Sequence, residues 1–143
     1  MPISSGQKKV NILIVEDEED VRNILKDILT QEGHRVETAS NGKRGIEKFN
    51  KKNFDMVLTD LGMPGMSGWQ VAEKIKAING KVPIALITGW SIELKESEIK
   101  ERGIDFIIKK PYKLAQLVNL VQEGISIVRL GFCKRRIEIV KFG

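Results

Sequence analysis

Residues Phe54–Gly68 of this 143-residue chain read FDMVLTDLGMPGMSG. The apolar run Met56–Leu58 is typical of a buried strand, and the glycine- and proline-rich segment that begins at Gly62 ends it. Asp60 is therefore predicted at the carboxyl end of a strand, the edge at which open α/β sheets bind ligands. An Asp in a turn also accepts hydrogen bonds from the following backbone, so this stretch alone leaves a structural and a functional role equally open.

Apolar runs alternate with segments of helical periodicity along the rest of the chain. The expected strands are 10–15, 35–38, 56–58, 82–87 and 105–108. The expected helices end near 32, span about 41–51, begin near 67, and span about 91–102 and 112–128. Strict alternation predicts a parallel sheet with helices on both faces. The helix expected at 91–102 is polar almost all round, so we expect it to pack weakly and to shift at low cost.

Length and composition indicate one domain in a reducing compartment. No apolar run approaches the length needed to cross a bilayer, and Met1–Lys9 lacks the apolar core of a secretory signal. Cys133 is the only cysteine in the sequence, so no intramolecular disulfide can form. We therefore expect a cytoplasmic protein without a membrane partner.

The net charge of +5 is concentrated at the C-terminus. Residues 124–143 carry five Lys or Arg against one Glu, which is +4 and leaves +1 for residues 1–123. A polyanion-binding surface across the whole fold is therefore not supported, and nucleic acid is an unfavoured partner. The basic extension 129–143 is too short for a DNA-binding domain, so we expect it to pack on the fold or to contact a second copy in a homodimer.

Acidic, hydroxyl and basic side chains follow the predicted strands at their carboxyl ends: Glu16, Asp17, Asp60, Thr88, Gly89, Lys109 and Lys110. Right-handed crossovers bring these ends to one edge of the sheet. Three carboxylates there would repel one another without a cation, and hard oxygen ligands suit Mg²⁺ (or Mn²⁺). A carboxylate nucleophile beside a lysine, a threonine hydroxyl and a glycine amide is what phosphoryl transfer to an Asp requires.

Four motifs in this order resemble a known family: IVEDEEDVR at 14–22, LTDLGMPGMSG at 58–68, LITG at 86–89 and IIKKPY at 107–112. Over roughly residues 9–123 the chain resembles the receiver domain of bacterial two-component response regulators. The resemblance implies a flavodoxin-like (βα)5 domain over residues 1–128, with a five-stranded parallel sheet in the order 2-1-3-4-5.

The resemblance also implies a role for each acidic position. Asp60 is similar to the phosphoacceptor of the family. Asp17 resembles a direct metal ligand, with Glu16 beside it acting mainly through water. The backbone carbonyl of Gly62 corresponds to the third protein ligand.

On the phosphate side, Thr88 resembles the family's switch hydroxyl and Gly89 supplies an amide that binds phosphate. Lys110, directly before Pro111, matches the family's lysine. Lys109 is the competing candidate, but alternation along the strand sends its side chain the other way.

Two positions depart from the family pattern or modify it. The family usually has Tyr or Phe three residues before the lysine, where this chain has Ile107, while Phe106 is expected to face the opposite side of the sheet. We expect Ile107 to respond to Thr88 by repacking. Trp90 is expected to exclude water from the phosphoryl group and so to lengthen its lifetime.

The leading hypothesis is a stand-alone receiver that accepts a phosphoryl group from a sensor histidine kinase or phosphotransfer protein and signals to an unidentified protein target. Such a receiver is not an enzyme, apart from its own phosphotransfer and autodephosphorylation. One alternative is a fragment of a longer regulator with a DNA-binding or enzymatic output domain.

Two alternatives of another class are disfavoured. An Asp-nucleophile phosphatase needs a second acid that Asp60-Leu61-Gly62 does not supply. A flavin-binding domain would carry a phosphate loop where Glu16 and Asp17 stand. His34, the only histidine, is expected as an exposed turn residue rather than a phosphoryl donor.

Overall fold

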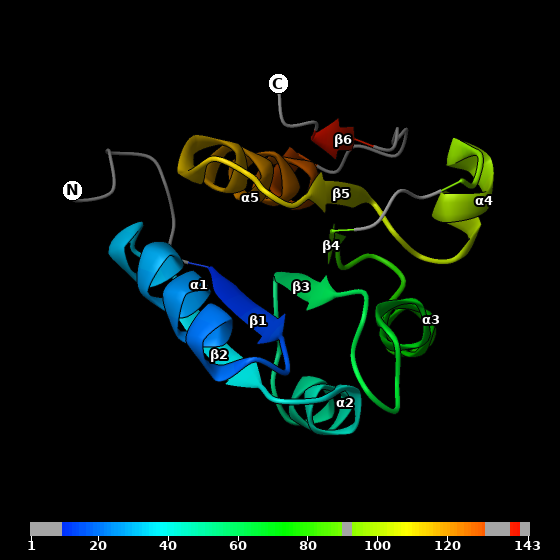
Figure 1. Ribbon diagram of the computed structural model, residues 1–143, viewed down its shortest axis with the longest axis horizontal. Coiled ribbons are helices and arrows are strands. Elements are labelled where there is room, and N and C mark those ends of the chain that lie inside the picture. The colour runs from blue at the N-terminus through cyan, green and yellow to red at the C-terminus, as the bar shows by residue number, and fades with distance from the viewer. Residues whose placement is uncertain (1–9, 90–92, 131–137, 141–143) are drawn as a thin grey trace.

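A computed structural model describes residues 10–89, 93–130 and 138–140. In this part of the chain, strands and helices alternate from end to end (Figure 1). The strands are β1 (Asn11–Val15), β2 (Arg35–Ala39), β3 (Met56–Asp60), β4 (Ile84–Thr88), β5 (Phe106–Lys109) and β6 (Glu138–Val140). The helices are α1 (Glu19–Gln31), α2 (Gly42–Lys51), α3 (Gly68–Ile78), α4 (Glu96–Glu101) and α5 (Leu114–Leu130).

All six strands form one parallel sheet in the order β2-β1-β3-β4-β5-β6. The predicted order 2-1-3-4-5 for the first five strands is confirmed. The predicted sheet of five strands did not include β6, which lies in the extension expected to pack on the fold and pairs with β5 from Phe106 opposite Glu138 to Ile108 opposite Val140. The chain leaves β5, crosses through α5 and returns as one more parallel strand at the edge.

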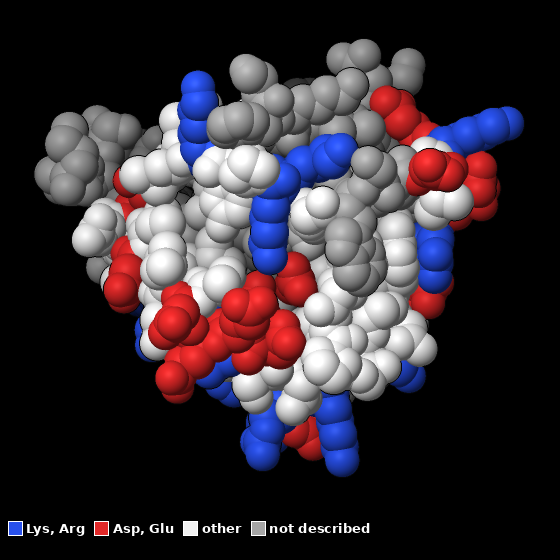
Figure 2. Space-filling model, in the orientation of Figure 1, with Lys and Arg blue, Asp and Glu red and all other residues white. Residues whose placement is uncertain are grey.

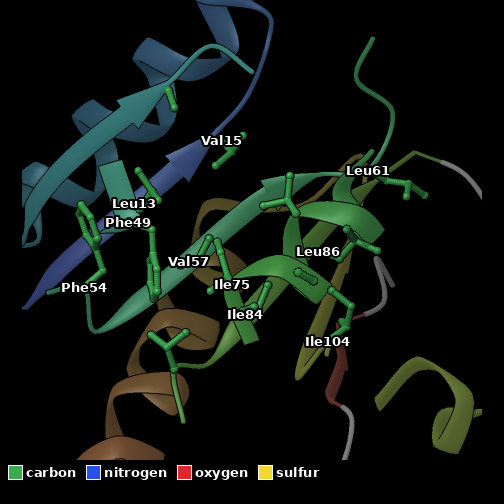
Figure 3. Packing of buried hydrophobic residues seen from close by; sticks show 14 of the residues in the cluster. Leu13, Val15, Phe49, Phe54, Val57, Leu61, Ile75, Ile84, Leu86 and Ile104 are labelled. Atoms are coloured by element: carbon green, nitrogen blue, oxygen red, sulfur yellow. The ribbon is translucent and has the colours of Figure 1, made fainter. Parts of the chain in front are cut away.

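Helices cover both faces of the sheet, with α1 and α5 on one face and α2, α3 and α4 on the other (Figure 1). Successive strand residues therefore point alternately into two separate hydrophobic cores, one on each face of the sheet. Leu13, Val57 and Leu86 point toward the α2–α4 side, as Figure 3 shows, whereas Ile14 and Leu58 pack toward α1 and α5. Burial on both faces explains why these strands are almost continuously apolar.

Glycine allows α5 to lie close to the sheet. A Cβ at Gly124 would lie 2.8 Å from the Sδ and Cε atoms of Met56, which is closer than side chains normally approach. Gly124 follows Leu117, Leu120 and Val121 on the buried side of α5. Leu114, the first residue of the helix, is apolar but 57% exposed.

The α4 helix is shorter than the predicted range of about 91–102. It begins at Glu96, and residues 93–95 before it are not helical. Ile99 is its only buried residue in the described part of the chain, with Leu94 partly buried before the helix. At the other end, the Arg102 guanidinium lies over the ring of Trp69 from α3, at 4.5 Å from the ring centre, and also pairs with Glu73. A cation–π contact and an exposed ion pair thus supplement a small apolar contact.

The expectation for His34 was wrong, because this side chain is buried with only 6% of its surface exposed. Gly33, at φ 95°, turns the chain after α1, and the His34 amide then donates to the Leu29 carbonyl. This tight turn folds the imidazole inward. Neither ring nitrogen has a hydrogen-bond partner among the described residues, and burial lowers the pKa of His34, with the negative charge of Glu32 partly opposing the change.

None of the helices described is long and apolar enough to span a membrane.

The buried His34 predicts a loss of stability in mild acid. The unfolded chain takes up a proton near the ordinary His pKa of 6.5, but the folded chain resists protonation, so the free energy of unfolding falls as pH drops below 6.5. His34→Gln cannot ionise and should lack this contribution, whose slope is at most about 1.4 kcal/mol per pH unit. Urea unfolding of both proteins between pH 7.5 and 5 measures the difference. Parallel pH profiles would contradict the prediction.

Candidate functional site

The carboxyl ends of β1, β3, β4 and β5 bring the predicted site residues to one edge of the sheet. Asp60 and Thr88 are the last residues of β3 and β4, whereas Glu16 and Lys110 directly follow β1 and β5. Figure 2 shows acidic side chains gathered in the middle of this face, with a basic side chain directly above them. The parallel topology thus assembles groups that are far apart in the sequence.

Three carboxylates form the acidic half of the site. One oxygen each from Glu16, Asp17 and Asp60 lie within 4.8 Å of one another. Glu16 and Asp60 are 1% and 7% exposed, and Asp17 is accessible to solvent. Close carboxylates in a poorly hydrated position are costly unless a positive charge joins them.

Glu16 is the most perturbed of the three. Burial raises its pKa to about 7, and the negative charge of Asp60 and the adjacent Asp17 carboxyl act in the same direction. The Glu18 amide opposes this change by donating to Oε2 at 3.0 Å, as does the charge of Lys110. The other oxygen, Oε1, is buried and has no hydrogen-bond partner among the described residues. An unpartnered buried carboxylate oxygen beside two further carboxylates fits a divalent cation.

Lys110 is the basic half of the site. Its Nζ atom lies 3.2 Å from Oδ1 of Asp60, and its amide donates to the Thr88 carbonyl at 2.8 Å. Lys109 instead pairs in the ladder with Thr88, inside β5. The structure therefore brings Lys110 to Asp60, as strand alternation predicts.

Thr88 is 2% exposed at the end of β4, and Gly89 and Gly62 are exposed in the loops that follow β4 and β3. A Cβ at Gly89 would meet nothing within 4 Å among the described residues, so packing against them does not require glycine there. The neighbouring Leu61 donates its amide to the Ile87 carbonyl at 2.9 Å. This bond continues the β3–β4 pairing one residue past Asp60.

Gly68, at the start of α3, is a site-building residue that the sequence interpretation missed. A Cβ there would lie 2.5 Å from the Asp60 carbonyl oxygen, so only glycine fits without displacement. The Gly68 amide also donates to the Leu61 carbonyl at 3.0 Å. Ser67 begins the helix with a capping box in which Ser67 and Gln70 exchange side-chain to backbone hydrogen bonds. The loop after Asp60 is thereby closed against the strand end.

Tyr112 and Arg22 were also not predicted as parts of the site. Tyr112 packs against the core on the α5 side, and burial raises its pKa, with the charges of Glu16 and Asp60 adding to the effect. Arg22 donates to the backbone of Glu16 and Asp17. Both residues lie in the quoted motifs, but nothing in the residue types alone indicates these contacts.

Ile107 is 2% exposed and packs in the core on the α2–α4 side, whereas Phe106 packs on the other side of the sheet. The aromatic neighbour therefore does not substitute for the residue at 107. Trp90 lies outside the described residues.

The sequence profile of the response regulator receiver domain matches residues 12–122. The transcriptional regulatory protein ZraR of Klebsiella oxytoca is 33% identical over 128 residues, which cover 89% of this chain and 28% of that protein. The sensory transduction protein RegX3 of Mycobacterium bovis is 33% identical over 121 residues, covering 85% of this chain and 52% of that protein. This chain thus spans about half or less of the length of these two relatives.

Solved structures show the same arrangement of elements. A CheY-like response regulator receiver domain protein from Methanospirillum hungatei superposes with a TM-score of 0.82 at 26% identity, covering 87% of this chain and 100% of that one. The chemotaxis protein CheY4 of Vibrio cholerae gives a TM-score of 0.76 at 26% identity, covering 81% of this chain and 98% of that one.

Mg²⁺ binding tests whether Glu16, Asp17 and Asp60 form a cation site. Mg²⁺ should bind the native chain and stabilise it, by about 2.7 kcal/mol at a concentration one hundred times the dissociation constant. Asp17→Asn should weaken this binding, whereas Asp20→Asn removes the same charge from the exposed first turn of α1 and should not. Isothermal titration calorimetry and thermal unfolding with and without Mg²⁺ measure both effects. Equal Mg²⁺ affinities of the two variants would contradict a cation site at these carboxylates.

Proposed function

The chain belongs to the response regulator receiver domain family, and on that premise we propose that Asp60 accepts a phosphoryl group from a sensor histidine kinase or a phosphotransfer protein. The single observation that carries this proposal is the pairing of Asp60 with Lys110 beside Glu16 and Asp17. A nucleophile, a fixed cation and an acidic site for a divalent metal then share one edge. The resulting aspartyl phosphate is the signal.

In this reaction an Asp60 carboxylate oxygen attacks the phosphorus of a phosphohistidine. An O–P bond forms, the N–P bond breaks, and the electron pair stays on the leaving imidazole, which takes up a proton. The Lys110 ammonium, already 3.2 Å from Oδ1, stabilises the negative charge on the transferred phosphoryl oxygens. The Thr88 hydroxyl and the Gly89 amide supply further donors at the same edge.

We assign the metal position to Asp17 and Asp60 with the backbone carbonyl of Gly62, and to Glu16 mainly through water. Mg²⁺ (or Mn²⁺) bound there supplies charge neutralisation during transfer. Oε1 of Glu16 is buried and has no partner among the described residues. Carboxylate oxygens are the ligands that such an ion prefers.

For the relay, we propose that Thr88 moves toward the phosphoryl group and that the core around Ile107 repacks in response. Thr88 and Lys109 are paired in the ladder, and Ile107 shares a core with Ile99, the buried residue of α4. A helix held by so little apolar contact can change position at a small cost in free energy. The altered α4 face is then what an as yet unidentified protein target recognises.

We further propose a cytoplasmic protein that is not an enzyme apart from its own phosphotransfer and autodephosphorylation. Residues 1–128 form the receiver domain, and residues 129–143 form an extension, of which 138–140 supply β6. A homodimer is compatible with this arrangement, and nucleic acid is not the expected partner of this domain. The lengths of ZraR and RegX3 favour, as a second candidate, the receiver portion of a longer regulator.

Phosphorylation by a small acyl phosphate in the presence of Mg²⁺ tests the acceptor. Intact mass should show a gain of one phosphoryl group in the native chain and in Asp27→Asn, which changes an exposed Asp on α1. Asp60→Asn should show no gain, because it lacks the nucleophilic oxygen. Phosphorylation of the Asp60→Asn variant would show that another residue is the acceptor. A native chain that remains unphosphorylated would refute the proposal.

Adjacent lysines provide a matched test of the proposed charge stabilisation. Lys110→Ala should slow phosphorylation roughly a hundredfold, because it removes a preorganised charge from the transferring group. Lys109→Ala removes the same charge one residue earlier and should stay close to the native rate. Rates come from the time course of intact mass at saturating donor. Equal rates for the two variants would refute the role given to Lys110.

A further inference from the structure

Arg22 occupies a position where the helix dipole alone disfavours a cation. It lies in the first turn of α1, at the positive end of the helix dipole, and its amide donates to the Glu18 carbonyl at 2.9 Å. Nearby Glu19 and Asp20 suit that end, whereas an arginine does not. Its presence calls for a compensating interaction.

The compensating interaction is with the acidic loop that follows β1. Side chains in a helix lean toward its N-terminus, which directs Arg22 back over the residues that precede the helix. Its Nη1 atom donates to the backbone carbonyl of Glu16 at 3.0 Å and to that of Asp17 at 3.3 Å. One guanidinium nitrogen thus bridges two successive carbonyls of the loop.

Two further bonds hold the same loop from other directions. The Glu16 amide donates to the Ala39 carbonyl at 3.0 Å, and the Glu18 amide donates to Oε2 of Glu16 at 3.0 Å. Together with the bonds from Arg22, these two bonds engage the backbone of the loop and Oε2 of Glu16. The Asp17 carboxylate and the other oxygen of Glu16 are left beside Asp60.

We propose that Arg22 is a positioning residue for divalent-cation binding. It holds the backbone of Glu16 and Asp17 so that their carboxylates meet Asp60 before the cation arrives. The inference rests on the proposed function, since it concerns the same metal position. Residues that orient metal ligands from behind commonly contribute tenfold or more to metal affinity.

The test compares Arg22→Gln, Arg22→Lys and Arg44→Gln. Arg44 is the matched control, because it is an exposed arginine in the first turn of α2. Calorimetric titration with Mg²⁺ should show about tenfold weaker binding for Arg22→Gln, native affinity for Arg44→Gln, and partial recovery for Arg22→Lys, which keeps a cationic donor. Hydrogen exchange of amides 16–18 in the metal-free proteins should be faster in Arg22→Gln than in the native chain.

Phosphorylation by a small acyl phosphate separates positioning from chemistry. Arg22→Gln should be slow at low Mg²⁺ and approach the native rate at saturating Mg²⁺, since only occupancy of the cation site is lost. Native Mg²⁺ affinity in Arg22→Gln, no recovery in Arg22→Lys, or a slow rate that persists at saturating Mg²⁺ would overturn the inference. Failure of the native chain itself to bind Mg²⁺ or to accept phosphate would instead overturn the proposed function.

Discussion

Electrostatic repulsion among Glu16, Asp17 and Asp60 is the constraint on which the rest of the structure depends. Their carboxylate oxygens lie within 4.8 Å, two of the side chains are buried, and the pKa of Glu16 is about 7 as a result of burial first and of its neighbours second. The ion pair of Asp60 with Lys110 compensates part of this cost. Strand register and the close approach of Gly68 bring the chain together at this edge, and Arg22 donates to the backbone of Glu16. A divalent cation at these carboxylates would neutralise the repulsion among them.

The features that the sequence predicts well are those set by local pattern. Continuous apolar runs indicate β1, β3, β4 and β5, and the parallel alternation of strands and helices is sufficient to predict Asp60 and Lys110 at one edge. Contacts between segments that are distant in the sequence could not be predicted from the local pattern. The clash that excludes a Cβ at Gly68 depends on how the loop closes on Asp60, and the bridge from Arg22 depends on the angle between β1 and α1.

Tertiary packing decides the burial of some residues against their local polarity. His34 is polar and follows a helix-ending glycine, yet the turn at Gly33 folds it inward. Conversely, Leu114 is apolar, yet it lies at the first turn of α5 and is exposed. The α4 helix differs from expectation only in its length, since its small apolar contact through Ile99 agrees with the polar sequence of this segment.

β6 changes what a second molecule meets at this end of the sheet. Because β5 is paired with β4 on one side and with β6 on the other, it is an interior strand at Phe106–Ile108. A strand from another chain can pair with β5 over these residues only by displacing β6, and otherwise it meets the outer side of the three-residue β6. A chain ending at Leu130 would present β5 as an open template, and open edges promote aggregation and strand exchange. In the described part of the chain, the edge of the sheet is therefore the three-residue β6 rather than β5.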